Sequence, residues 1–80
     1  MNVFQKLLDM LARLETARIH YTLAHFRPET VSVEIAVPGE RWEVEFFADG
    51  SIDVEVFSSQ AQGELEGEEA LERLFATHGA

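Results

Sequence analysis

The chain has 80 residues, no cysteine and a formal net charge of −9, from fifteen acidic and six basic residues. This length fits a single small domain over residues 1–80, and a hydrophobic fraction of 46 % is enough for a folded core. Without cysteine, disulfides and thiolate chemistry are excluded. The acidic charge disfavours binding to nucleic acid or to an anionic membrane and favours a basic protein partner, although acidic surfaces also serve solubility alone.

The N-terminus does not have the features of a targeting segment. It lacks the basic flank and the unbroken apolar run of a signal peptide, and no apolar stretch is long enough to cross a membrane. We therefore expect a cytoplasmic protein. A domain of this size without disulfides has a small core, so formation of a homodimer is a second way to gain stability.

The first expected element is an amphipathic helix that ends near Ala17 or Arg18. Asn2 is placed to cap it, with Gln5 at the spacing of a capping box. Apolar residues then recur three and four positions apart, which is the period of one helix face. The face expected to cover the core, widened by Met10, consists of Phe4, Leu7, Leu8, Leu11 and Leu14.

Two segments typical of strands follow the helix. Residues 19–26 leave both parities open, and the bulkier set is preferred for the inward face: Ile19, Tyr21 and Leu23. Residues 27–30 are expected to turn because proline fixes φ and donates no backbone N–H. Residues 31–37 alternate strictly, and the inward residues are Val31, Val33, Ile35 and Val37.

Residues 42–57 form the clearest element, a β-hairpin with one apolar and one acidic face. A three-residue loop at 48–50 puts Gly50 in the left-handed position of a type I turn with a bulge. It also pairs apolar residues with one another along the hairpin: Phe46 with Ile52, Val44 with Val54, and Trp42 with Val56. By the same reasoning, a four-residue loop at 38–41 pairs Val37 with Trp42, Ile35 with Val44, and Val33 with Phe46.

The same hairpin register places acids opposite acids on the other face. Glu45 falls opposite Asp53, Glu43 falls opposite Glu55, and Arg41 falls opposite Phe57. Like charges directly across a sheet cost about 0.2–1 kcal/mol per pair. We therefore expect repulsion to raise the pKa of these carboxyls in the folded state, so that mild acid and added salt stabilise the protein.

The remaining chain is expected to supply a connection and a second helix. Residues 58–67 are polar, and Leu65, their one apolar anchor, seats either a short extended piece or the next helix. The helix is expected from Glu68, with Gly67 as its cap and Gly79 as its stop. The predicted fold is α+β, an antiparallel meander of three to four strands with the N-terminal and C-terminal helices on one face. The other face is left uncovered.

This uncovered face is the predicted functional surface. It carries the candidate partner-binding residues Glu34, Arg41, Glu43, Glu45, Phe47, Asp53, Glu55 and Phe57. Acids mixed with aromatic and arginine side chains are typical of a docking surface for a cationic partner, and the plain alternative is a solvated face. Phe47 and Phe57 are either interface anchors or rings covered by residues 58–67.

No motif predicts catalysis, a cofactor or a metal. The three histidines, His20, His25 and His78, do not have the spacing of a ligand cluster. Residues 49–55 alternate oxygen-bearing side chains as a calcium loop does, but a strand explains that alternation and the glycine is misplaced. We therefore expect a binding protein rather than an enzyme, with no catalytic, cofactor-binding or metal-ligating residues.

The run from Val37 to Phe46, Val-Pro-Gly-Glu-Arg-Trp-Glu-Val-Glu-Phe, and the following Asp49-Gly50 turn carry a resemblance. With the order helix, meander, helix, they resemble small bacterial conserved-hypothetical proteins, and the likeness covers most of the chain. It implies this fold and no activity. In size and charge the chain also resembles, loosely, acidic immunity proteins that neutralise basic toxins, and acidic secretion chaperones.

Overall fold

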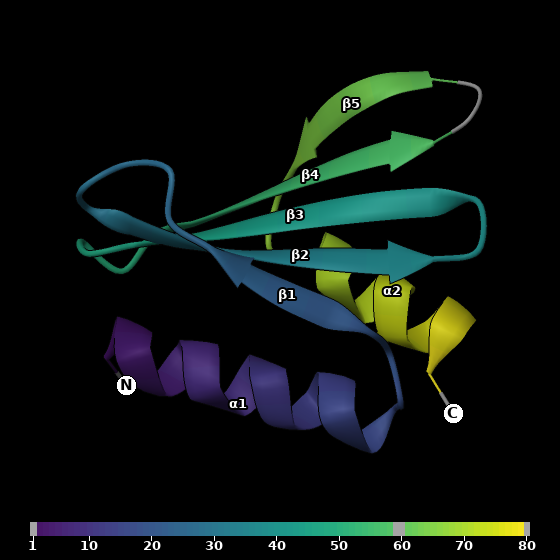
Figure 1. Cartoon of the computed structure of the whole chain (residues 1–80), viewed down its shortest axis with the longest axis horizontal. Coiled ribbons are helices and arrows are strands. Elements are labelled where there is room, and N and C mark those ends of the chain that lie inside the picture. Colours follow the sequence, from purple (N-terminus) through teal and green to yellow (C-terminus); the bar gives the residue numbers. More distant parts are fainter. Residues whose placement is uncertain (1, 59–60, 80) are drawn as a thin grey trace.

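The computed structural model describes residues 2–58 and 61–79, with residues 61–64 described by their backbone alone. In chain order the elements are α1 (Val3–Thr16), β1 (Tyr21–Ala24), β2 (Thr30–Val37), β3 (Glu40–Phe47), β4 (Ile52–Ser58), β5 (Ala61–Glu66) and α2 (Ala70–His78). The strands form one antiparallel sheet in the order β1-β2-β3-β4-β5, and both helices lie on the same face of it (Figure 1). The predicted α+β meander with two helices on one face is confirmed. Among the described residues, no helix has the length and apolar character needed to cross a membrane.

The sheet has five strands rather than three to four, because residues 61–66 pair with β4. This strand does not follow the usual alternation. Its register places Leu65 opposite Glu55 on the face away from the helices, and Glu66 opposite Val54 on the helix face. A glutamate can lie there because Arg73 of α2 donates two hydrogen bonds to it, of 3.0 and 3.2 Å. Of the two alternatives for the segment around Leu65, the extended one is correct, and the strand depends on a partner that lies on another element.

The register of the β3–β4 hairpin is as predicted, including Phe46 opposite Ile52 and Trp42 opposite Val56. Gly50 has φ of 95°, and its N–H donates to the Phe47 carbonyl over 2.9 Å. This is the left-handed loop position that glycine occupies without strain.

The predicted register of the β2–β3 hairpin is wrong by two residues. Val37 pairs with Glu40 and Ile35 with Trp42, so the loop contains only Pro38 and Gly39. Gly39 has φ of 80°, and proline followed by such a glycine is typical of a type II turn. A shift of two residues preserves which face each side chain occupies, so the inward set was still predicted correctly.

The first helix buries a different stripe from the one expected. Asn2 caps it as predicted, accepting a 2.8 Å hydrogen bond from the Gln5 N–H, and the helix ends at Thr16. The buried residues are Leu7, Met10 and Leu14, whereas Phe4 and Leu8 are 64 % and 42 % exposed. The helix carries two overlapping apolar stripes, one from Val3 and one from Phe4, and a helix can turn only one of them to the sheet.

The first strand is shorter than the expected 19–26, since β1 spans only Tyr21–Ala24. Its preferred parity is correct, since Tyr21 faces Ile35 and Leu23 faces Val33 on the helix side. The final helix starts at Ala70 rather than Glu68, and Gly67 is not its cap residue.

The core lies between the sheet and the helices. Trp42 is the largest of its fully buried residues, and the others come from the helices and strands: Leu14, Val33, Ile35, Val44, Val54 and Leu74. Because these residues face the helices, the residues that alternate with them on the same strands, including the acids, lie on the opposite face of the sheet.

Candidate functional site

The face of the sheet turned away from the helices is called the outer face below. All eight candidate residues lie on it, because they alternate with the buried residues of β2, β3 and β4. The strand register sorts them into rows across the sheet. One row consists of Glu34, Glu43, Glu55 and Leu65, and a second consists of Ser32, Glu45 and Asp53.

Glu43 is at the centre of the first row, between two other glutamates. The actual β2–β3 register makes Glu34 its neighbour, and Glu55 lies opposite it on β4, as predicted. In a two-residue hairpin, Val37–Glu40 and every second pair beyond it are hydrogen-bonded. The Glu34–Glu43 pair is therefore of the closer kind, with Cα atoms about 4.5 Å apart.

The pKa of the Glu43 carboxyl is raised above its ordinary value. Partial burial is the main cause, and the negative charges of Glu34, Glu55 and Glu45 add to it. Arg41 opposes the shift, with its guanidinium 3.4 Å from the carboxylate. The expected direction at Glu43 is therefore correct, although burial contributes more than repulsion.

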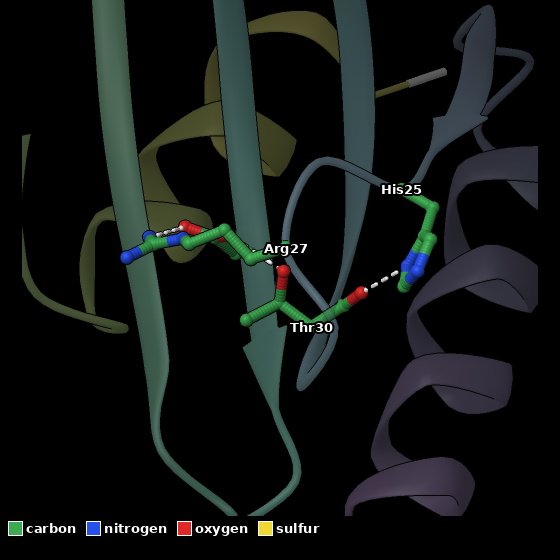
Figure 2. Close-up of polar contacts among 4 residues, drawn as sticks. His25, Arg27 and Thr30 are labelled. Atoms are coloured by element: carbon green, nitrogen blue, oxygen red, sulfur yellow. Dashed lines mark hydrogen bonds and ion pairs between the residues drawn. The ribbon is translucent and has the colours of Figure 1, made fainter.

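The pKa of Glu45 shifts in the opposite direction, because its carboxylate binds an arginine that the sequence pattern did not suggest. Arg27 reaches from the β1–β2 loop over the outer face and donates to both Glu45 oxygens, with its Nε 3.0 Å from Oε2 (Figure 2). The Thr30 hydroxyl donates to the same Oε2 over 2.7 Å. The Arg27 hydrogen bonds are the main reason that the pKa of Glu45 is lowered, so the predicted increase at this residue is wrong.

The position of Arg27 follows from the way the loop is tied down. The Thr30 N–H donates to the Arg27 carbonyl, and the Ala48 N–H donates to the Glu29 carbonyl. His25 lies on the other side of this loop, toward α1 (Figure 2), and its Nδ1 is 2.8 Å from the Thr30 carbonyl. A carbonyl only accepts, so Nδ1 carries the proton. The loop thus covers one corner of the outer face, which was expected to be uncovered.

Arginines also lie over the two aromatic rings of the outer face. Arg27 is 5.1 Å from the centre of the Phe47 ring, and Arg41 is 4.4 Å from that of Phe57, the contact expected from their register. Both rings are half-buried. Each end of the outer face therefore has an arginine, an aromatic ring and a glutamate in contact.

The middle of the outer face is hollowed and acidic. A depression of about 120 Å³ is lined by Arg27, Glu43, Glu45, Asp53, Glu55 and Leu65. Within the part of the chain that the structure describes, Glu34, Asp53 and Glu55 form no ion pair. Leu65 is 71 % exposed beside them. The sequence pattern missed both Arg27 and Leu65, because one belongs to a loop and the other to the strand with inverted alternation.

Comparisons with models of protein families, with curated proteins and with solved structures found no match to this chain. Among the described residues, no three histidine, aspartate or glutamate side chains are arranged to hold a metal ion. The carboxylates that do gather there can accept hydrogen bonds and bind cationic side chains.

Proposed function

We propose that this protein is an immunity- or inhibitor-like module that binds a basic protein partner through its outer face, and that it acts by binding rather than by catalysis. The observation that carries the proposal is the row Glu34–Glu43–Glu55. Like charges held side by side across a sheet cost stability. A cationic partner would remove that cost, so its binding would gain from repulsion that already exists in the free protein.

The contact between Arg27 and Glu45 supports an arginine as the group that is bound. Here a guanidinium of the chain itself donates to both oxygens of an outer-face carboxylate and lies near Phe47. One row away, Glu43 and Glu55 offer similar carboxylates beside the exposed Leu65. An arginine of the partner could bind them through the same bidentate hydrogen bonds, with the aliphatic part of its side chain against Leu65.

The size of the depression also favours a side chain over a small-molecule substrate. Its volume of about 120 Å³ is well below the roughly 300–1,000 Å³ of typical ligand pockets. Two aromatic rings, each covered by an arginine, lie at the ends of the same face. Aromatic and arginine side chains commonly anchor protein interfaces.

Titration of an arginine-rich peptide tests this proposal directly. The variant Glu43→Gln/Glu55→Gln is compared with Glu68→Gln/Glu69→Gln, which changes the net charge equally at exposed residues before α2. We expect the outer-face pair to lose about tenfold or more in affinity, and the control pair to lose much less. Affinity of the natural sequence should fall as salt is added.

The same two variants serve as baits for the partner in extracts of the source cell. A basic protein retained by the natural sequence and by the Glu68/Glu69 control, but not by the outer-face variant, would support the proposal. Equal losses with both variants would mean that only net charge matters, and retention of a partner that is not basic would contradict the proposal.

A further inference from the structure

The two edges of the sheet differ in how they are protected. At β5, Glu66 points a carboxylate to the helix face, and charged residues pointing inward are a common protection against edge-to-edge pairing. At β1, the residues on the helix face are Tyr21 and Leu23, neither of which is charged, and Leu23 is 54 % exposed. The β1 edge is therefore the one that lacks this protection.

Exposed apolar side chains gather beside this edge. Of the five large apolar residues that are exposed in the described part of the chain, four belong to α1, to β1 or to the loop after it: Phe4, Leu8, Leu23 and Phe26. We call Phe4, Leu8 and Leu23 the α1–β1 strip. An exposed strip of this kind commonly marks an interaction site.

One hydrogen bond and one shared hollow place the Phe4–Leu8 side of α1 toward β1 and the residue that follows it. Phe4, Leu8 and Glu15 share one helix face by spacing. Glu15 accepts a hydrogen bond from the Tyr21 hydroxyl at one end of that face. At the other end, Phe4 and His25 line the same apolar hollow, of about 260 Å³. Leu23 lies between Tyr21 and His25 in sequence, so it falls beside the middle of the same helix face.

The backbone of β1 offers free hydrogen-bonding groups at two residues. The Ala36 N–H donates to the His20 carbonyl, which makes His20–Ala36 a hydrogen-bonded pair of the β1–β2 register. Alternate residues of an antiparallel strand turn their N–H and C=O to opposite sides. The groups of Thr22 therefore face β2, and those of Tyr21 and Leu23 face away from the sheet.

The charge of the residues around β1 indicates which kind of protein can pair with this edge. Residues 16–28 are the longest acid-free stretch of a chain whose net charge is −9. A basic partner of the outer face would find no carboxylate in this stretch. The carboxylates nearest to β1 come from other elements: Glu15 accepts a hydrogen bond from the Tyr21 hydroxyl, and Glu34 lies opposite Thr22 on the outer face. The strand itself therefore adds no carboxylate to an interface with a second copy of this acidic chain.

We propose that β1 pairs antiparallel with β1 of a second copy of the chain, about a two-fold axis at Thr22. Tyr21 of each copy then pairs with Leu23 of the other, which uses the outward backbone groups of both strands. The two α1–β1 strips lie side by side, and Arg18 falls opposite Phe26 of the second copy. Phe4 and Phe26 are 64 % and 63 % exposed near this edge, so their rings are available to add apolar area to the interface.

Light scattering over a series from micromolar to millimolar concentration tests the pairing. We expect the mass to rise to that of a dimer, and Leu23→Lys to weaken the association about tenfold or more. Leu65→Lys is the matched control, because Leu65 is also an exposed leucine of an edge strand but lies at the opposite edge, and it should leave the dimer intact. A strict monomer at all concentrations, or a dimer that Leu23→Lys does not weaken, would overturn the proposal.

Hydrogen exchange tests the register without any substitution. The amides of Tyr21 and Leu23 should exchange quickly in dilute protein and slowly in concentrated protein, whereas that of Thr22 should stay protected at both concentrations. A dimer in which the Tyr21 and Leu23 amides remain unprotected would place the interface elsewhere. The outer-face variant Glu43→Gln/Glu55→Gln should dimerise normally, so the dimer and the proposed binding function fail independently.

Discussion

Glu43 and Glu45 are two positions apart on one strand and face, yet their pKa values shift in opposite directions. The difference lies in what each carboxylate touches. Glu45 accepts hydrogen bonds from Arg27 and Thr30, whereas Glu43 is partly buried between Glu34 and Glu55 with one arginine contact. Alternation alone makes the two residues equivalent, and they are distinguished by their neighbours across the strands and by the loop that carries Arg27.

Replacement of Glu43 by glutamine should stabilise the protein at neutral pH. Because the folded pKa is raised, the ionised carboxylate is less favourable in the folded than in the unfolded state. Removal of the charge should raise the free energy of unfolding by about 0.2–1 kcal/mol, the scale of cross-strand pairs. Urea unfolding at several pH values measures this, and the gain should vanish below about pH 4, where both states are protonated. A loss of stability at neutral pH would contradict it.

Glu45→Gln should have the opposite effect. A folded pKa below the unfolded value contributes stability that is present at neutral pH and is lost as the pH falls through the folded value. We expect the variant to lose about 1 kcal/mol at neutral pH, because Arg27 is left without its carboxylate, and progressively less in acid. If the two variants show the same pH dependence of stability, the assigned roles of Arg27 and of burial are wrong.

At the scale of elements, the β3–β4 hairpin was predictable because two requirements agree. Apolar pairing and the glycine position in the loop select the same register, with Gly50 at φ of 95°. In the β2–β3 hairpin, apolar pairing does not select a loop length, because a shift of two residues keeps the apolar faces together. The turn residues do select one, since Pro38-Gly39 fits a two-residue type II turn with Gly39 at φ of 80°. The inward stripe of α1 was ambiguous for a similar reason, since Phe4 and Leu8 extend a second apolar stripe.

The β5 strand was not predictable from alternation because its stability depends on α2. The Arg73 side chain, which donates to Glu66, lies on a helix that follows the strand in sequence. The same limit applies to the outer face. Its eight candidate residues follow from strand parity, whereas Arg27 reaches the surface from a turn whose direction is set by tertiary hydrogen bonds.

Arg73→Met tests the dependence of β5 on α2. The change leaves the half-buried Glu66 carboxylate without its two hydrogen bonds, and we expect a loss of about 1 kcal/mol or more in stability. Relative to the natural sequence, the variant should show a larger increase in the rate of hydrogen exchange in β5 than in β2, which would locate the effect in β5. Addition of Glu66→Gln should recover part of the loss, because an amide is less costly than a charge when its partner is missing. Equal exchange throughout the sheet would show that Arg73 acts on the whole fold instead.

At the scale of the whole molecule, the outer face and the β1 edge are different surfaces. The acids of β3 and β4 occupy the outer face, whereas β1, which contains no acidic residue, forms one edge of the sheet. The two proposed interactions therefore use different surfaces. A two-fold axis between paired edge strands of one sheet is perpendicular to that sheet, so a β1–β1 dimer would carry both outer faces on the same side.

This geometry predicts avidity for partners that carry two basic segments. A tandem arginine-rich peptide with a flexible linker should bind the dimer far more tightly than a single segment does, by up to about 10²–10⁴-fold when the linker spans both faces. Leu23→Lys should remove this gain and leave the affinity for the single segment unchanged, because Leu23 is not on the outer face. Calorimetry with both peptides measures the two affinities. If Leu23→Lys gives a monomer that keeps the full tandem affinity, the second segment gains nothing from a second outer face.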